Sequence, residues 1–264
     1  MNLLFIGDIV GKSGRRAVRE RLAALRDAKR ADFVVANAEN AADGLGLNRS
    51  TMEELFQAGA DVLTLGDHAW DKRDIIPLLE TETRLLRPGN YPPGVPGRGS
   101  GVFTTASGLK IGVMCAQGRT FMMKQVLDDP FRWAKEEAGK LRAQTTILAL
   151  DFHAEATSEK GAIGRHLDGL VSAVLGTHTH VQTADERVLP KGTAFISDAG
   201  MTGPRDSVIG FKPDSVLARF TTQMSQRLEV AEGAVEMCGV IVSIDDKTGQ
   251  AESIERVRET VEAA

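Results

Sequence analysis

Two histidines separated by a single residue, His178 and His180, follow an apolar run at residues 171–176. In an extended segment alternate side chains share a face, so both imidazoles can converge on one point at the end of a strand. Imidazole is the commonest metal-ligating side chain in proteins. The pair therefore predicts a metal site at a strand end.

Other apolar, strand-like runs also end in acidic, amide or imidazole side chains. Any one of these residues alone is most often an ordinary polar loop residue, but the coincidence of all of them favours a shared site. His166 lies in an apparent helix away from any strand end, so we expect no chemistry from it. The further candidates are Asp8, Glu39, Asn40, Asp67, His68 and His153.

The chemistry of this set points to metal ions. Carboxylate and imidazole ligands without thiolates suit first-row ions such as Mn, Fe or Zn, and they argue against a structural zinc-thiolate site. The candidates outnumber what one ion needs, so two ions that share a bridging carboxylate are the simplest arrangement. Such pairs, about 3.5 to 4 Å apart, activate a water and stabilise both ends of a phosphoryl displacement.

The first loop offers a rival interpretation. Residues 7–13 read Gly-Asp-Ile-Val-Gly-Lys-Ser, close to the phosphate-binding motif G-x-x-x-x-G-K-[ST] but with three residues between the glycines instead of four. The missing residue removes a backbone N–H from the phosphate cradle and re-aims the lysine. We therefore expect an ordinary strand, turn and helix, with Ser13 as the N-cap.

Strands and helices alternate in the first part of the chain. The apolar patterns predict strands at residues 3–6, 33–36 and 62–65 and a helix at 15–29. A second helix is expected to begin at the capping box of Ser50 and Glu53 and to end at Gly59. This alternation is typical of parallel βαβ units, which bring the carboxyl ends of their strands to one edge of a sheet.

The second half predicts more strands. Residues 87–101 are too rich in Pro and Gly for regular structure, and we expect a surface loop rather than an interdomain linker. Strands are expected at 110–115, 146–150, 171–176 and 194–197, with a late pair near 228–230 and 235–244, and a helix is capped at Asp129. Two packed sheets flanked by helices accommodate this order in a single α/β domain spanning residues 1–264.

Composition limits the partners. The 264 residues are 42% hydrophobic and carry 32 Lys and Arg against 36 Asp and Glu, a net charge of -4, which argues against a long nucleic-acid partner but not against a single nucleotide. No apolar run approaches the roughly 20 residues that span a bilayer, and the N-terminus lacks a basic signal region, so we expect a cytoplasmic protein without a membrane partner. Cys115 and Cys238 lie in apolar runs and are expected to be buried, unreactive thiols.

Six motifs stand out along the chain, and they are Phe5–Gly11, Asn37–Ala42, Asp151–Lys160, Gly176–Thr183, Leu189–Thr193 and Asp198–Pro204. Together they resemble the YmdB-like branch of the calcineurin-type metallophosphoesterases. This resemblance implies a four-layer α/β/β/α sandwich with a dinuclear metal centre. It also implies hydrolysis of cyclic nucleotides, chiefly 2',3'-cyclic and also 3',5'-cyclic monophosphates.

The resemblance also implies a role for each candidate. The cofactor would be two divalent or mixed-valence ions, with Fe and Mn favoured and Zn an option, and family members tend to be homo-oligomers. An imidazole beside the ions would stabilise the phosphorane oxygens or protonate the leaving ribose oxygen. By motif, Asp8, Asn40 and His180 would bind one ion, Asp67, His153 and His178 the other, Glu39 would bridge them, and His68 would be the catalytic histidine.

One residue departs from the family pattern, because Gly66-Asp67-His68 stands where the family usually has Gly-Asn-His. An asparagine ligates through its carbonyl and still donates an N–H, whereas an ionised aspartate only accepts. Asp67 also gives the centre one positive charge fewer, which should tighten metal binding and weaken attraction for a phosphodiester. A mixed Fe(III)/M(II) pair would restore that charge.

Three alternatives remain open beside a phosphodiesterase. The first is a phosphomonoesterase that uses the same metal pair. The second is a regulator that binds nucleotide or metal with weak turnover, motivated by the extra charge of Asp67. The third is a structural scaffold, although packing alone gives no reason for histidines at strand ends.

Overall fold

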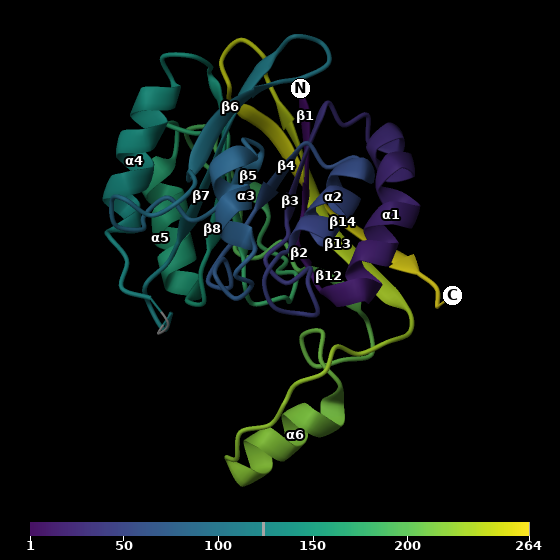
Figure 1. Cartoon of the computed structure of the whole chain (residues 1–264). Helices are drawn as coiled ribbons and strands as arrows, with labels where there is room; N and C mark the ends of the chain where they lie inside the picture. The colour runs from purple at the N-terminus through teal and green to yellow at the C-terminus, as the bar shows by residue number, and fades with distance from the viewer. Residues whose placement is uncertain (123–124, 264) are drawn as a thin grey trace.

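The computed structural model describes residues 1–122 and 125–263, and its elements form four layers (Figure 1). Among these residues the strands form two sheets that pack face to face. Helices α1 (Gly11–Ala28), α2 (Arg49–Gln57) and α3 (Ile75–Thr81) cover the first sheet, and α4 (Pro130–Leu141) and α5 (Thr157–Leu167) cover the second. The predicted four-layer α/β/β/α sandwich is confirmed.

The first sheet contains the βαβ units expected from the first part of the chain. Its order is β2-β12-β13-β1-β3-β4-β5, and β14 also pairs with β13. Strands β1, β3, β4 and β5 run parallel to one another. The bounds are β1 Asn2–Ile6, β2 Asp8–Ile9, β3 Phe33–Asn37, β4 Val62–Thr64, β5 Leu85–Leu86, β12 Met201–Pro204, β13 Val235–Ile244 and β14 Ala251–Val261.

The second sheet has the order β10-β11-β9-β8-β7-β6. Strands β7, β8, β9 and β11 are parallel, so their carboxyl ends also meet at one edge. The bounds are β6 Ser100–Thr104, β7 Lys110–Gln117, β8 Ile147–His153, β9 Ala173–Thr177, β10 Arg187–Val188 and β11 Ala194–Ile196.

The apolar run of β1 is buried on both sides. Leu3 and Phe5 belong to the core between the two sheets, whereas Leu4 and Ile6 pack in the core under the outer helices. Successive strand residues point to opposite faces, so a strand covered on both faces is apolar throughout. This double burial explains why the run carries no polar alternation.

Two predicted N-caps are wrong. Helix α2 begins at Arg49, with Asn48 as its N-cap: Oδ1 of Asn48 accepts from the N–H of Thr51, and Oγ1 of Thr51 accepts from the N–H of Asn48. Asparagine caps as well as serine, so the box simply lies two residues earlier. Helix α1 begins at Gly11, and Ser13 lies inside it and donates to the carbonyl of Ala231.

Two further expectations need correction. Residues 228–230 are not a strand, since β13 pairs instead with β14, whose buried Ile254, Val257 and Val261 are spaced three or four residues apart like those of a helix. The Pro- and Gly-rich loop does connect β5 to β6, but it is not purely a surface loop. The buried guanidinium of Arg87 donates to the carbonyls of Pro88, Val95, Pro96 and Gly97, so the loop folds around this side chain.

Residues 205–234, here called the arm, project from the body (Figure 1). The arm contains α6 (Pro213–Thr222), and its two ends are joined where the N–H of Lys212 donates to Glu229 and that of Ala231 to Gly210. Among the described residues, no helix has the length and apolar content needed to cross a bilayer.

Candidate metal centre

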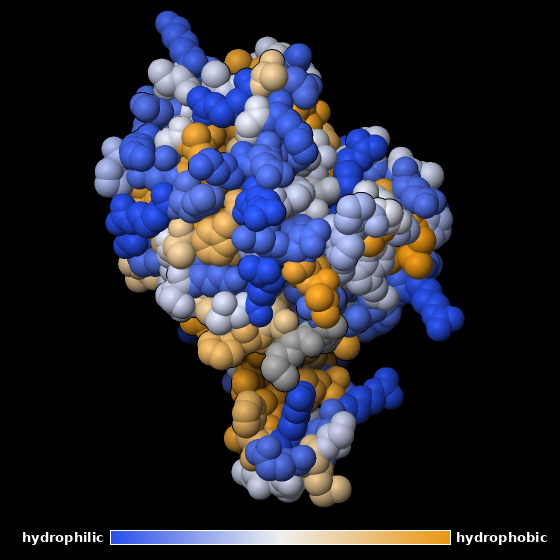
Figure 2. All heavy atoms as spheres, turned by 90° about the vertical axis from the view of Figure 1, so that its left-hand side faces the viewer, coloured by the Kyte–Doolittle hydropathy of each residue, from blue (hydrophilic) through white to orange (hydrophobic). Residues whose placement is uncertain are grey.

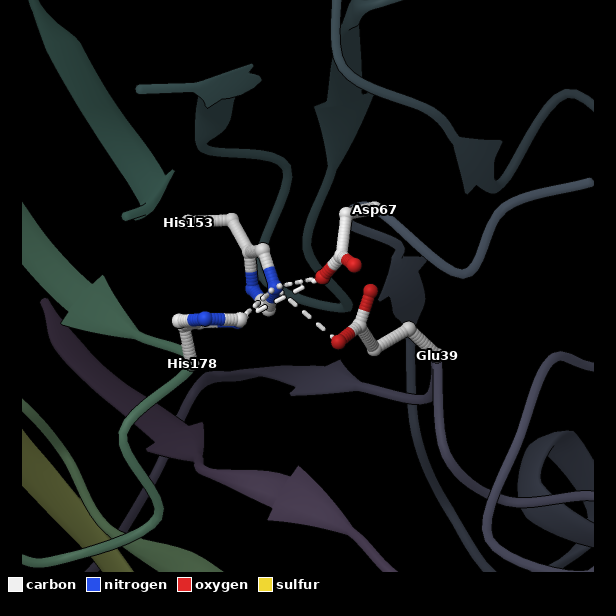
Figure 3. A group of neighbouring side chains, drawn as sticks. All are labelled: Glu39, Asp67, His153 and His178. Carbon is white, nitrogen blue, oxygen red and sulfur yellow. Dashed lines mark hydrogen bonds and ion pairs between the residues drawn. The ribbon is translucent and has the colours of Figure 1, made fainter. Parts of the chain in front are cut away.

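Four side chains from both sheets converge at the carboxyl ends of their strands (Figure 3). Glu39 follows β3, Asp67 follows β4, His153 ends β8 and His178 follows β9. Each offers one ligand atom, and these atoms all lie within 4.8 Å of one another. Two carboxylates facing two imidazoles form a donor set that suits a first-row metal ion.

His153 lies at the middle of this cluster. Its Nε2 is 2.9 Å from Oε1 of Glu39, 3.2 Å from Oδ1 of Asp67 and 3.0 Å from Nδ1 of His178. Nδ1 of His178 is in turn 3.4 Å from Oδ1 of Asp67. Such crowding of donor atoms around one point fits a shared cation.

The remaining candidates lie directly beside this cluster. Nδ2 of Asn40 is 3.3 Å from Oε1 of Glu39 and 3.2 Å from Nε2 of His180, which lies 3.9 Å from Oδ1 of Asp8. Glu39 therefore contacts both His153 in the four-residue cluster and Asn40 in this neighbouring set of side chains. Oδ1 of Asp8 is buried and has no hydrogen-bond partner among the described residues. A buried carboxylate oxygen is costly unless paired, so this atom fits a cation.

Hydrogen bonds fix which ring nitrogen of His153 faces the cluster. Oγ1 of Thr177 donates to Oδ1 of Asp151 at 2.7 Å and therefore accepts from Nδ1 of His153 at 2.9 Å. With Nδ1 bonded to Thr177, Nε2 is the ring atom that faces Glu39 and Asp67 and that is available to a metal ion. Such outer partners orient metal-ligating histidines.

The other two imidazoles are oriented in the same way. Nε2 of His178 lies 3.2 Å from a carboxylate oxygen of Glu155, which leaves Nδ1 for the cluster. Nδ1 of His180 donates to the carbonyl of Ile209 at 2.8 Å, which leaves Nε2 facing Asp8. Each histidine thus presents one ring nitrogen to the candidate metal ligands.

The turn that carries His178 and His180 differs from the extended segment expected from the sequence. Strand β9 ends at Thr177, and both histidines have left-handed backbone, with φ of 101° and 66°. The N–H and Oγ1 of Thr179, between them, both donate to Oδ2 of Asp198. Lys160 donates to the same oxygen at 2.7 Å, so a buried ion pair fixes the turn.

Electrostatics also favour a cation. Burial raises the pKa of Asp8. Burial acts in the same direction on Glu39 and Asp67, but their interactions with His153 outweigh it and the pKa of both carboxyls is lowered. Burial would lower the pKa of His153, yet Glu39 and Asp67 hold that pKa well above its usual value. The field that draws a proton to His153 also attracts a metal ion.

His68 lies beside the cluster and lines the cavity over it. Its backbone N–H donates to Oε2 of Glu39 at 3.1 Å, and its Nδ1 lies 2.6 Å from Oδ2 of Asp71. Gly66, two residues before His68, leaves room for the cluster itself, because a Cβ at that position would lie 2.3 Å from Cδ2 of His153. The imidazole is thus held where it can exchange a proton with a bound group.

The sequence interpretation missed the supporting shell. Asp151 is buried between the sheets, where Asn37, Thr64 and Thr177 donate to it. The sequence does contain a signal for this residue, because an acidic residue that directly follows an apolar strand-like run needs buried hydrogen-bond partners. His166, by contrast, lies in α5 with its ring 5.7 Å from that of Phe131, away from the cluster as expected.

The sequence pattern of the YmdB-like protein family matches residues 4–257. The chain belongs to the YmdB-like family. It is 47% identical over 257 residues to a YmdB-like relative, the 2',3'-cyclic-nucleotide 2'-phosphodiesterase of Bacillus subtilis (strain 168), covering 97% of this chain and 96% of the relative.

Solved structures agree with this membership of the YmdB-like family. A crystal structure of a hypothetical protein from Thermus thermophilus superposes with a TM-score of 0.92 at 42% identity, covering 98% of this chain and 99% of the other. A crystal structure described as a novel phosphatase from Mycoplasma pneumoniae has a TM-score of 0.93 at 34% identity, covering 100% and 94%.

Proposed function

We propose that the protein is a dinuclear metal-dependent phosphodiesterase that hydrolyses 2',3'-cyclic nucleotide monophosphates, and 3',5'-cyclic ones as further substrates. The observation that carries this proposal is the convergence of Glu39, Asp67, His153 and His178 within 4.8 Å. The substrate class is supported by the Bacillus subtilis relative, which is named as a 2',3'-cyclic-nucleotide 2'-phosphodiesterase.

In this proposal two ions, Fe or Mn with Zn as an option, are held by the two groups of side chains. When bound, they supply the Lewis acidity that polarises a phosphoryl oxygen and makes a water nucleophilic at neutral pH. The oxygen of Asp8 that lacks a hydrogen-bond partner and the oriented histidine nitrogens support the assignment. One ion is assigned to Asp8, Asn40 and His180, the other to Asp67, His153 and His178, with Glu39 between them.

His68 is proposed as the general acid. Asp71 holds Nδ1 of His68, and Nε2, which lies 3.9 Å from Oδ2 of Asp67, is the ring atom on the side of the cluster that would protonate the leaving ribose oxygen. A general acid of this kind typically contributes about 10²- to 10⁴-fold in rate.

The cavity over the cluster supports a substrate of nucleotide size. Its volume is about 860 Å³, within the usual range for small-molecule sites. Lys72, Arg219 and Arg227 are among its lining residues and would attract an anionic phosphodiester.

The test is hydrolysis of 2',3'-cAMP by protein loaded with Mn or Fe. The His68→Ala variant should lose about 10²-fold or more in kcat, whereas His166→Ala should retain wild-type activity because its ring lies in α5 against Phe131. Absence of any hydrolysis that depends on His68 would count against the proposal.

A second candidate is a phosphomonoesterase with the same metal pair, because the Mycoplasma pneumoniae relative is described as a phosphatase. Comparing rates on adenosine monophosphates and on 2',3'-cAMP separates the two activities. Both esters release a ribose oxygen that needs a proton, so the ratio of the two rates, and not the effect of losing His68, decides between the activities.

The contacts of Asp67 support a third candidate function, that of a regulator that binds its ligand with weak turnover. Asp67 faces both His153 and His178, and its charge makes the centre less electrophilic. Under this candidate Asp67→Asn raises the hydrolysis of 2',3'-cAMP. An unchanged or lower rate rejects it.

We also propose that the enzyme acts in the cytoplasm on small molecules, without a long nucleic acid or membrane partner, and that it forms homo-oligomers. The net charge of -4 argues against a long nucleic-acid partner. Homo-oligomer formation is supported by three exposed apolar side chains of the arm, Leu217, Phe220 and Met224. Light scattering during size-exclusion chromatography tests the oligomeric state.

A further inference from the structure

The arm is joined to the body directly beside the metal centre. Nδ1 of His180 donates to the carbonyl of Ile209 at 2.8 Å. The backbone of Val208 and Phe211 exchanges two hydrogen bonds, of 2.9 and 3.0 Å, across Ile209 and Gly210. The arm therefore begins with a tight turn that is bonded to a candidate metal ligand.

Ile209 is an unusual residue for this turn. Both central residues have left-handed backbone, with φ of 48° at Ile209 and 101° at Gly210. Tight hairpin turns with two such residues favour Asn, Asp and Gly, and a β-branched side chain is strained there. Ile209 is also 46% exposed, so packing does not offset the strain. Strained residues of this kind concentrate at ligand sites.

Phe211 packs against the loop of residues 39–44, which follows β3. A Cβ added at Gly44 would lie 3.1 Å from Cε1 of Phe211, so the aromatic ring packs over this glycine. The N–H of Gly44 donates to the carbonyl of Asn40 at 3.1 Å. The half-buried ring is thus placed next to the loop that presents Glu39 and Asn40.

The cavity consequently has two chemically different parts. Glu39, Asn40, His68, His178 and His180 line the end of the cavity at the candidate metal centre. Charged side chains such as Lys72, Arg219 and Arg227 also line the cavity, and four apolar side chains form its other part. Figure 2 shows apolar side chains gathered where the arm joins the body. The apolar lining consists of Leu45, Ile209, Phe211 and Leu228.

A cyclic nucleotide has the same division into an anionic phosphate and a flat, largely apolar base. We propose that Ile209, Phe211 and the neighbouring apolar residues form a nucleobase subsite, in which the base stacks on Phe211 while the phosphate lies at the metal centre. This inference rests on the proposed phosphodiesterase function. It makes the arm a determinant of specificity for nucleotides over simple cyclic phosphates.

The experiment compares two substrates with the same reacting bond, 2',3'-cAMP and methyl β-D-ribofuranoside 2,3-cyclic phosphate, which lacks the base. Phe211→Leu should raise the KM for 2',3'-cAMP about tenfold, the usual effect of losing one stacked base, and leave the abasic substrate unchanged. The matched control is Phe121→Leu, because Phe121 is 77% exposed and is not among the residues that line the cavity.

Ile209→Asn separates recognition from folding. Asparagine tolerates left-handed backbone and leaves the carbonyl of residue 209 in place for His180, so the melting temperature should stay the same or rise. The KM for 2',3'-cAMP should nevertheless increase several-fold. A variant that is less stable and equally impaired on both substrates would contradict the subsite.

The outcomes distinguish this inference from the function on which it rests. If the wild-type protein hydrolyses neither substrate, the proposed function and the subsite both fall. If it hydrolyses both and the Phe211 and Ile209 variants leave the ratio of kcat/KM values unchanged, only the subsite falls. A selective loss on 2',3'-cAMP supports both.

Discussion

Nε2 of His153 lies 2.9 Å from Oε1 of Glu39, although the two residues come from different sheets. His153 ends β8 in the second sheet, and Glu39 follows β3 in the first. Both side chains are almost fully buried. The candidate metal centre therefore lies where the two sheets meet, and neither sheet alone can form it.

The first prediction concerns the link between Asp151 and His153. Thr177→Val preserves the shape of the buried side chain but removes the hydroxyl that accepts from His153 and donates to Asp151. His153 then loses its fixed orientation, and metal affinity should fall about 10- to 100-fold. Stability should fall by about 1 to 3 kcal/mol, because buried polar groups lose their partner.

Calorimetric titration with Mn measures this affinity, and chemical denaturation measures the stability. Thr177→Ser keeps the hydroxyl and should bind metal nearly as the wild type does. Equal metal affinity in the Val and Ser variants would contradict an orienting role.

The second prediction concerns the buried ion pair of Lys160 and Asp198, whose atoms are 2.7 Å apart. Lys160→Met leaves the carboxylate buried without its cation and should destabilise the fold by about 3 to 5 kcal/mol. The matched control is Lys140→Met, because Lys140 pairs with Glu137 at 2.9 Å but is 71% exposed. Removing that surface pair should cost at most about 1 kcal/mol. Urea denaturation measures both values, and equal losses would contradict the assigned role of the buried pair.

The third prediction concerns the cysteines, which are buried and unpaired as the sequence suggested. Burial raises the pKa of Cys238 to about 11 and that of Cys115 well above its usual value. Since the thiolate is the reactive form, neither should react with iodoacetamide at pH 8 in the folded protein. Both should react after unfolding in urea, and mass spectrometry counts the adducts.

The same pKa shift gives a direction for stability against pH. A thiol whose pKa is raised by folding holds its proton more tightly in the folded state than in the unfolded chain. The contribution of Cys238 is therefore full below its ordinary pKa of 9.0 and is lost as the pH rises toward 11. Cys238→Ala should reduce this loss of stability at alkaline pH. If the free energy of unfolding falls between pH 9.0 and 11 as steeply in the variant as in the wild type, Cys238 does not make this contribution.

The sequence predicted the layers well because their signals are local. The run Leu3–Ile6 is apolar throughout, which is typical of a strand covered on both faces, and the structure has this arrangement. Strand β14 gave no such signal. Its charged residues and its apolar spacing of three or four residues depend on an antiparallel pairing with β13 that no local pattern reveals.

The same contrast holds for the site. The candidate ligands could be placed because parallel strands bring their carboxyl ends to one edge. The left-handed turn of His178 and His180 could not be predicted from the sequence. It depends on Asp198 and Lys160, which contact the turn only in the folded chain. The orientation of His153 likewise depends on Thr177, whose hydroxyl has no recognisable pattern in the sequence.

The most direct test of the account is hydrolysis of 2',3'-cAMP by chelator-treated protein as Mn is titrated back. The clustered carboxylates and imidazoles predict no hydrolysis without metal and full activity once two equivalents are bound. Undiminished hydrolysis by protein shown to be free of metal would contradict the central claim, as would the absence of hydrolysis at every metal load.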